Sequence, residues 1–230
     1  MIKAFYTGVT GASANQTYLD VIGNNIANIQ TEGYKHLKPE FIDLLYTNMS
    51  QGQEADVMVG AGTKADKTDT IYTPGTMMQT DRQLDFAITE DGFFGIQFED
   101  EILYTRAGSF VVGNIDGENY LMMNGGYVLD QNEEPIVLTE GMQVIPAVYQ
   151  FSNNDDLVQV GNTMFRIDNE NAEYQMYEES PIKQGFVEGS NVNLANEMVR
   201  MIQAQRAFQF NSRIIQVADE IQQTINTLKN

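Results

Sequence analysis

The chain has 230 residues, a formal net charge of −19 and a pI near 4.2. With only 13 basic residues it lacks the positive surface that nucleic acids and anionic membranes attract, so neither is expected as a partner. It contains no cysteine, which excludes disulfides, thiolate metal sites and cysteine nucleophiles, and no apolar run is long enough for insertion into a membrane.

Residues 3–29 are predicted to form a helix. Apolar residues recur along it at heptad-like spacings and form a seam of Phe5, Val9, Ala12, Leu19 and Ile26. The dipeptide at residues 32–33, Glu-Gly, fits the turn that ends the segment. Pro39 is then predicted to start a short second helix, with apolar residues Phe41, Ile42, Leu44, Leu45 and Met49.

From about residue 51, short runs rich in β-branched and aromatic residues alternate with glycine-containing turns. This spacing predicts a mostly antiparallel β domain. The expected strands lie at residues 70–73, 84–88, 92–98, 102–105, 110–112, 120–123, 127–129, 136–138 and 143–151. Residues 152–186 are expected to add one or two hairpins and a return connection.

The C-terminal segment returns to helical periodicity. Asn193 is the predicted N-cap, and residues 191–230 contain neither glycine nor proline, so one helix of about 35 residues is expected. Its seam alternates spacings of three and four, as in a straight helix. The seam residues are Leu194, Met198, Met201, Ala204, Ala207, Asn211, Ile214, Ala218, Ile221, Ile225 and Leu228.

The sequence therefore predicts an α+β fold in which long N- and C-terminal helices form a coiled-coil-like domain around an inserted, mostly antiparallel β domain. The expected boundaries are residues 1–35 and 188–230 for the terminal helical assembly domain, 36–68 for the short helix and connecting segment, and 69–187 for the β domain. Two seams that pair only with each other bury too little apolar surface to offset the ordering of both helices. Assembly with further copies is therefore expected, and an isolated intramolecular coiled coil is the alternative.

Charge is distributed unevenly along the chain. Residues 1–30 balance to zero and residues 191–230 carry +1, so residues 31–190 carry −20. Near-neutral ends favour surfaces that contact other protein, while an acidic middle favours a surface left in water. The same distribution also arises if charged residues simply occupy the exposed part of the fold.

The sequence offers no catalytic, cofactor or metal site. His36 is the only histidine, so a catalytic relay has a single candidate base, and no phosphate-binding loop is present. The glycine-rich segment at residues 60–65 is not followed by the helix that a dinucleotide site needs. Residues 130–134 start like a calcium loop but lack its glycine and closing glutamate, which favours a hairpin turn.

Amide side chains are dense along both terminal helices, where hydrogen bonds between helices can fix register and partner identity. For any single amide, an exposed and neutral position is the simpler interpretation. The expected assembly interface combines these amides with the seams and comprises Phe5, Val9, Ala12, Leu19, Asn24, Asn25, Ile26, Asn28, Asn191, Asn193, Leu194, Met198, Met201, Gln205, Phe208, Asn211, Ile214, Ile221, Ile225 and Leu228.

Three sets of motifs resemble the axial proteins of the bacterial flagellum, specifically the rod and hook family. They are N-N-I-A-N and T-E-G-Y-K at residues 24–28 and 31–35, L-D-F-A-I and Y-T-R-A-G-S-F at 84–88 and 104–110, and E-G-S-N-V-N-L and Q-R-A-F at 188–194 and 205–208. The segment P-E-F-I-D-L-L-Y at residues 39–46 is most similar to the distal rod members.

The resemblance implies a non-catalytic subunit that polymerises into a helical tube, with the terminal helices inside and the β domain outside. It implies export through the flagellar type III apparatus without a cleaved signal peptide, a location in the basal body outside the cytoplasmic membrane, and neighbouring rod and hook proteins as partners. A hook or proximal rod subunit is the alternative within the family. A β-rich binding module on a helical stalk is the alternative outside it, with Phe93 or Phe94 supplying an outward ring.

Overall fold

The computed structural model describes residues 2–48, 58–98, 101–139, 144–169, 172–178 and 180–228. The chain divides into two compact units. The helical unit contains residues 1–27, 37–70 and 193–230, and the β unit contains residues 28–36 and 71–192. The predicted α+β organisation, with terminal helices and an inserted antiparallel β domain, is confirmed.

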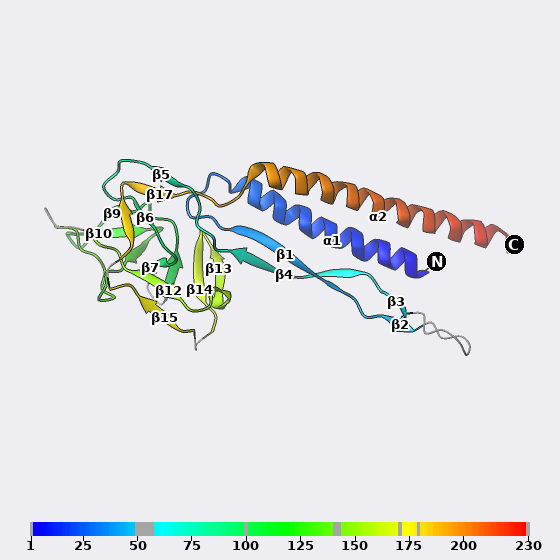
Figure 1. The fold of residues 1–230 in the computed structure, drawn as a ribbon, viewed down its shortest axis with the longest axis horizontal. Helices are drawn as coiled ribbons and strands as arrows, with labels where there is room; N and C mark the ends of the chain where they lie inside the picture. The colour runs from blue at the N-terminus through cyan, green and yellow to red at the C-terminus, as the bar shows by residue number, and fades with distance from the viewer. Residues whose placement is uncertain are drawn as a thin grey trace. The chain divides into compact units, whose positions relative to one another are not determined.

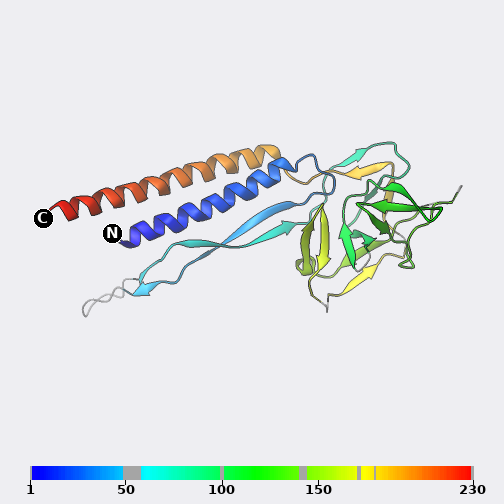
Figure 2. The same ribbon diagram turned by 180° about the vertical axis from the view of Figure 1, so that it is seen from behind.

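The helical unit is built on α1 (Ile2–Ala27) and α2 (Leu194–Leu228), which run antiparallel side by side (Figures 1 and 2). Both predicted terminal helices are therefore confirmed, and α2 has 35 residues. Two glycines allow the helices to approach closely: a Cβ atom on Gly8 would lie 3.1 Å from the Cγ1 atom of Ile215, and one on Gly11 would lie 2.9 Å from the Nδ2 atom of Asn211. Ala12 and Ala204 are buried in this unit.

Asn193 caps α2, as the sequence predicts. The backbone N–H of Asn196 donates to the Asn193 Oδ1 atom at 3.1 Å, which satisfies one of the free donors at the helix N-terminus. The backbone N–H of Glu197 donates to the Asn193 carbonyl at 3.0 Å and closes the first turn. Glu197 also places a carboxylate in that turn, where the helix dipole favours negative charge.

The predicted short helix after Pro39 is wrong. Residues 36–43 form strand β1 (His36–Asp43), which pairs with β4 (Thr63–Ile71) in a two-stranded ribbon. At the far end of this ribbon, β2 (Thr47–Asn48) pairs with β3 (Met58–Val59). The apolar residues of this segment are compatible with either a helix or a strand, and pairing with the distant strand β4 selects the strand. Of the residues expected in that helix, Met49 lies outside the described part of the chain.

A contact with α1 also holds the ribbon in place. The Tyr18 and Phe41 rings meet edge to face with centroids 5.9 Å apart, and the ribbon runs along α1 in both views (Figures 1 and 2). Thr10 lies where a Cβ atom on Gly62 would stand, so only glycine fits at this point of the ribbon. This packing gives a two-stranded element the support that it needs to be stable.

The β unit is a mainly antiparallel assembly. Its nine-stranded sheet follows the order β13-β14-β8-β7-β11-β10-β9, and β12 joins both β7 and β15. The strands of this sheet are β7 (Phe93–Gln97), β8 (Ile102–Thr105), β9 (Val111–Ile115), β10 (Glu118–Met123), β11 (Gly126–Val128), β12 (Val148–Phe151), β13 (Leu157–Gly161), β14 (Met164–Ile167) and β15 (Tyr174–Met176).

Two small sheets complete the β unit. They pair β5 (Met77–Gln79) with β17 (Phe186–Glu188), and β6 (Phe86–Ile88) with β16 (Ile182–Gln184). A short 3-10 helix, η1 (Asn154–Asp156), precedes β13. The expected strand at residues 136–138 is wrong, because this segment makes only an isolated bridge between Val137 and Tyr120.

Two aromatic cores lie on opposite faces of β7. Phe94 packs with Phe86 and Phe110 in one core, and Phe93 packs with Tyr149 and Phe165 in the other. Phe93 and Phe94 are both buried, so the expectation that one of them supplies an outward ring is wrong. The physical reason is that β7 is a central strand with both faces covered, where alternation of side chains leads to two interiors.

The buried tyrosines predict sensitivity to alkali. Burial raises the pKa values of the Tyr104 and Tyr149 hydroxyls above the ordinary value of about 10. Unfolded tyrosine loses its proton near that value while the folded state retains it, so stability is full below about pH 10 and falls as the pH rises further. The absorbance of tyrosinate should therefore show at least two late-titrating groups, Tyr104 and Tyr149. Tyr149→Phe should change the free energy of unfolding at neutral pH by less than about 1 kcal/mol, because the Tyr149 hydroxyl has no hydrogen-bond partner among the described residues. The variant should also lose less stability as the pH rises above about 10, because it lacks one of the groups that titrate there.

Candidate functional site

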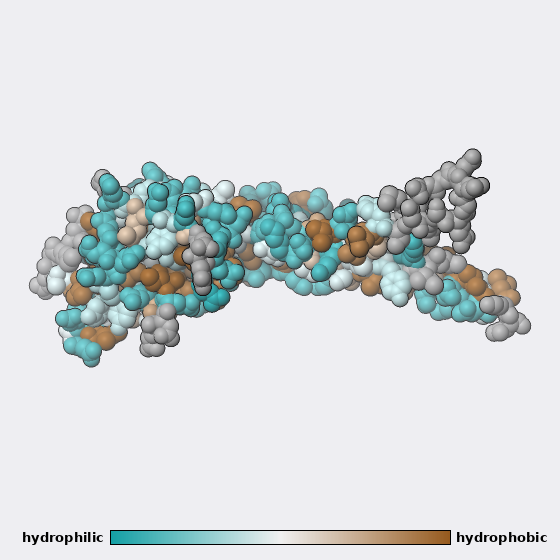
Figure 3. All heavy atoms as spheres, turned by 90° about the horizontal axis from the view of Figure 1, so that it is seen from below, coloured by the Kyte–Doolittle hydropathy of each residue, from teal (hydrophilic) through white to brown (hydrophobic). Residues whose placement is uncertain are grey.

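The pairing of α1 with α2 leaves apolar side chains uncovered on both helices. On α1, Tyr6 is 61% exposed, and Phe5 and Val9 are also exposed. On α2, the exposed large apolar side chains are Leu194, Met198, Val199, Ile202, Phe210, Val217, Ile221, Ile225 and Leu228. Figure 3 shows one face of the molecule, where apolar side chains in brown reach the surface between polar ones in teal.

The predicted seams are covered only in part. Ala12 is buried, while Leu19, Ile26, Met201, Phe208, Asn211 and Ile214 are half-buried. Seven other seam residues and the amide Gln205 of the expected interface remain exposed; the seam residues are Phe5, Val9, Leu194, Met198, Ile221, Ile225 and Leu228. Soluble proteins rarely leave so extended an apolar surface in water without a partner to cover it.

The predicted amides have different environments. Asn25 is buried and joins three elements: its Nδ2 group donates to the Leu37 carbonyl at 2.8 Å and to Glu197 Oε2 at 3.2 Å, and its Oδ1 atom accepts from the Leu37 N–H at 3.0 Å. Glu197 in turn accepts from Arg200 at 2.6 Å. Asn25 therefore ties α1 to β1 and α2 within one chain.

The other amides of the expected interface either form hydrogen bonds within the chain or lie at its surface. Asn191 accepts from the His36 N–H at 2.7 Å and donates to the carbonyls of Ile71 at 2.7 Å and Thr73 at 2.9 Å. Asn28 accepts from the Thr31 hydroxyl at 3.1 Å, and Asn24 is exposed. Asn193 is the N-cap of α2. The predicted role of these amides between copies stays a prediction.

A buried cluster of charges, Lys35, Arg106 and Glu188, lies in the β unit and was not predicted. Glu188 accepts from the Lys35 Nζ group at 2.6 Å, the Gly75 N–H at 2.7 Å and the Arg106 Nη1 group at 3.2 Å. Each of the three charged residues is only 1% exposed. Burial lowers the pKa values of Lys35 and Arg106, and the Glu188 carboxylate opposes this shift. The Lys35 Nζ group also donates to the Thr73 carbonyl at 2.9 Å.

Comparisons with known proteins identify the family. A family described as "Flagella basal body rod protein" matches residues 5–35, and one described as "Flagellar basal body rod FlgEFG protein C-terminal" matches residues 183–228. The flagellar basal-body rod protein FlgG of Bacillus subtilis is 34% identical, with all of both chains covered. The chain belongs to the flagellar basal-body rod family.

Other relatives support the same placement. The FlgG rod proteins of Agrobacterium fabrum and Borreliella burgdorferi are 34% and 32% identical, with 96% and 100% of this chain covered, and 97% and 99% of theirs. The flagellar hook protein FlgE of Borreliella burgdorferi is 31% identical, but the match covers 60% of this chain and 34% of the hook protein. Similarity to the rod members thus extends along the whole chain, and the hook alternative is not favoured.

The two segments of the rod family contact each other within each unit. In the β unit, Lys35 from the first segment pairs with Glu188 from the second. In the helical unit, Asn25 from the first bonds to Glu197 from the second. Several amides of these segments carry equal weight in the sequence, whereas burial in the fold separates Asn25, which is buried, from Asn24, which is exposed.

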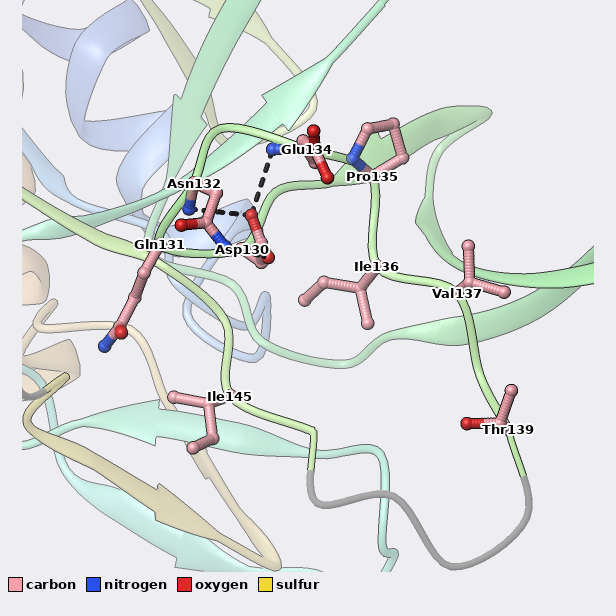
Figure 4. Close-up of a pocket in the computed structure, with 9 residues that line it drawn as sticks. All are labelled: Asp130, Gln131, Asn132, Glu134, Pro135, Ile136, Val137, Thr139 and Ile145. Atoms are coloured by element: carbon pink, nitrogen blue, oxygen red, sulfur yellow. Dashed lines mark hydrogen bonds between the residues drawn. The ribbon is translucent and has the colours of Figure 1, made fainter.

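The described residues contain no group of three His, Cys, Asp or Glu side chains that could hold a metal ion. A hollow of about 410 Å³ lies beside residues 130–137. In the turn that borders it, drawn in Figure 4, Asp130 Oδ1 accepts the N–H groups of Asn132 at 2.8 Å and Glu134 at 3.0 Å. This is the tight turn that the sequence predicted in place of a calcium loop. Neither described helix is both long and apolar enough for a membrane span.

Proposed function

We propose that the chain is a structural subunit of the flagellar basal-body rod that polymerises with its own copies through α1 and α2, without catalytic activity. The observation that carries this function is the apolar surface left exposed on both helices after they have paired. The full-length similarity to FlgG rod proteins supports a place in the rod, and within it we favour the distal segment.

The same function implies neighbours and a location. The partners would be further copies, adjoining rod and hook proteins, and the flagellar export apparatus. The subunit would act outside the cytoplasmic membrane after export without a cleaved signal peptide. The alternative of a β-rich binding module loses its main support, because Phe93 and Phe94 are buried in the two cores.

Charge substitutions in the seams test this function. Leu194→Asp and Ile26→Asp should reduce filament formation at least tenfold in sedimentation and electron microscopy, because each introduces an unpaired carboxylate into a surface that becomes buried. The β unit should remain folded, with unchanged near-ultraviolet circular dichroism.

Val158→Asp is the matched control, since this side chain is 41% exposed on the β unit. It should polymerise like the unmodified chain. If both seam variants still form filaments, the seam does not carry assembly.

A further inference from the structure

Strand β9 lies at the open end of the nine-stranded sheet. It pairs with β10 along its whole length, from Val111 to Ile115, and with no other described strand. Proteins normally protect such an edge with charged side chains, proline or a β-bulge, because its unpaired backbone groups attract further strands. The strand at the other end, β13, has a register irregularity between Gln159 and Gly161. β9 has a regular register and contains neither a charged residue nor proline, so it is the unprotected edge.

The register identifies which backbone groups of β9 face the open side. On the far side of β10, the Leu121 N–H donates to the segment at residues 136–138 at 3.0 Å, and the Asn119 carbonyl accepts from it at 2.7 Å. Leu121 and Asn119 therefore direct their backbone groups away from β9. In an antiparallel pair, the residues opposite them also direct both backbone groups away from the ladder. These residues are Val112 and Asn114, so their N–H and C=O groups point to the open side of β9.

The core face of the sheet is incomplete at this edge. Val112 lies opposite Leu121, which is fully buried in the core, yet Val112 is 51% exposed because no described strand lies beyond it. Side chains on neighbouring strands pack against each other on the same face. A further strand would therefore place an apolar side chain beside Val112 and remove apolar surface from water.

The other face of the edge is apolar at one end and acidic at the opposite end. Val111 is 51% exposed, and Glu118 lies on the same face opposite Ile115. Asp116 is exposed in the adjoining turn. Residues 107–165 contain acidic residues but no lysine, arginine or histidine. A second copy of this chain would bring the same negative charge to the contact, whereas a basic segment would be attracted.

We propose that the open edge of β9 binds an extended segment of another protein in which basic and apolar residues alternate, and that this segment joins the sheet as a further strand. Its backbone bonds to Val112 and Asn114, and its apolar side chains extend the core face. Its basic side chains cover Val111 with their stems and direct their charges toward Glu118. In strand addition of this kind, main-chain bonds supply affinity and side chains supply specificity. The contact is separate from polymerisation through α1 and α2.

A short synthetic peptide of alternating lysine and valine, with blocked ends, tests the proposal on the full chain. It should bind with a Kd below about 1 mM. At saturation, hydrogen exchange at the Val112 and Asn114 amides should slow at least tenfold, because both N–H groups become bonded. The same peptide with glutamate in place of lysine should not bind.

Two variants test the backbone and the charge separately. Val112→Pro removes an outward N–H group and no bond to β10, so it should weaken binding of the lysine peptide at least tenfold while the chain stays folded. Glu118→Lys leaves the backbone of β9 unchanged and should weaken binding at least threefold, which keeps the test decisive if the proline variant does not fold. Glu173→Lys is the matched control, since it makes the same change at an exposed position on β15's side of the chain, outside β9 and β10.

The outcomes also separate this proposal from the proposed function. Binding without slowed exchange at Val112 and Asn114 would show only general attraction to an acidic surface and would overturn the proposal. Absence of binding at about 1 mM, or equal binding of the glutamate peptide, would overturn it as well. Val112→Pro should form filaments like the unmodified chain; their loss would make the edge a contact between copies instead. Failure of the peptide to bind leaves polymerisation through the helices unaffected.

Discussion

Glu188→Gln is expected to lower the free energy of unfolding of the β unit by at least about 3 kcal/mol. The substitution keeps the shape of the side chain but removes its charge, so two buried cations lose their counter-ion. Glu188 holds Lys35 at 2.6 Å and Arg106 at 3.2 Å. The nearest remaining acidic group, Asp91, lies 3.8 Å from Arg106 and is 75% exposed, so it compensates weakly.

Urea unfolding followed by tyrosine signals measures this effect. The chain has 11 tyrosines and no tryptophan, and the cores of the β unit contain several of the rings. Glu134→Gln is the control, because it makes the same chemical change at an exposed turn position. It should alter the free energy of unfolding by less than about 0.5 kcal/mol. If both variants lowered the free energy of unfolding equally, the Glu188 charge would not stabilise the β unit more than an exposed carboxylate does.

Asn25→Ala is expected to destabilise the helical unit by about 2–4 kcal/mol. The variant loses two bonds to the backbone of Leu37 and one to the buried carboxylate of Glu197. The N–H and carbonyl of Leu37 then lose their amide partner, and Glu197 keeps Arg200 as its bonded neighbour. The β1 ribbon should also be released from the end of α1, because the Asn25 bonds attach its first residues.

Helix content at 222 nm during thermal unfolding reports this loss, and hydrogen exchange at Leu37 reports release of the ribbon. Asn226→Ala is the matched control, since it deletes the same group from an exposed position of α2. Its effect should stay below about 0.5 kcal/mol. Faster exchange at Leu37 should occur in Asn25→Ala alone; similar exchange in both variants would argue against a connecting role for this amide.

The family motifs are relevant to two different properties, the stability of the chain and its assembly with other copies. The N-N-I-A-N and E-G-S-N-V-N-L motifs were expected to contribute amides to contacts between copies. In the structure Asn25, Asn191 and Asn193 are engaged in bonds within the chain. The exposed apolar part of α1 and α2 is available to another copy, and the role of the motif amides between copies stays a prediction. Substitutions of Asn25, Asn191 and Asn193 should therefore lower stability, and substitutions of the exposed apolar residues of α1 and α2 should affect assembly.

The sequence by itself determined the elements of secondary structure that neighbouring residues specify. Helical periodicity without glycine or proline identified α2, Asn193 was recognised as its cap, and the alternation of short runs with turns identified the β domain. Each of these signals lies within a few residues of the structure that it specifies, so no knowledge of the fold is needed.

Only the tertiary structure decided features whose partners are distant along the chain. Lys35 and Glu188 are 153 residues apart, and Asn25 and Glu197 are 172 apart. The segment after Pro39 became a strand because β4 pairs with it, and Phe93 and Phe94 became core residues because β7 is covered on both faces. Hydrogen-bond satisfaction and burial depend on what the fold brings alongside a residue, and no local pattern contains that information.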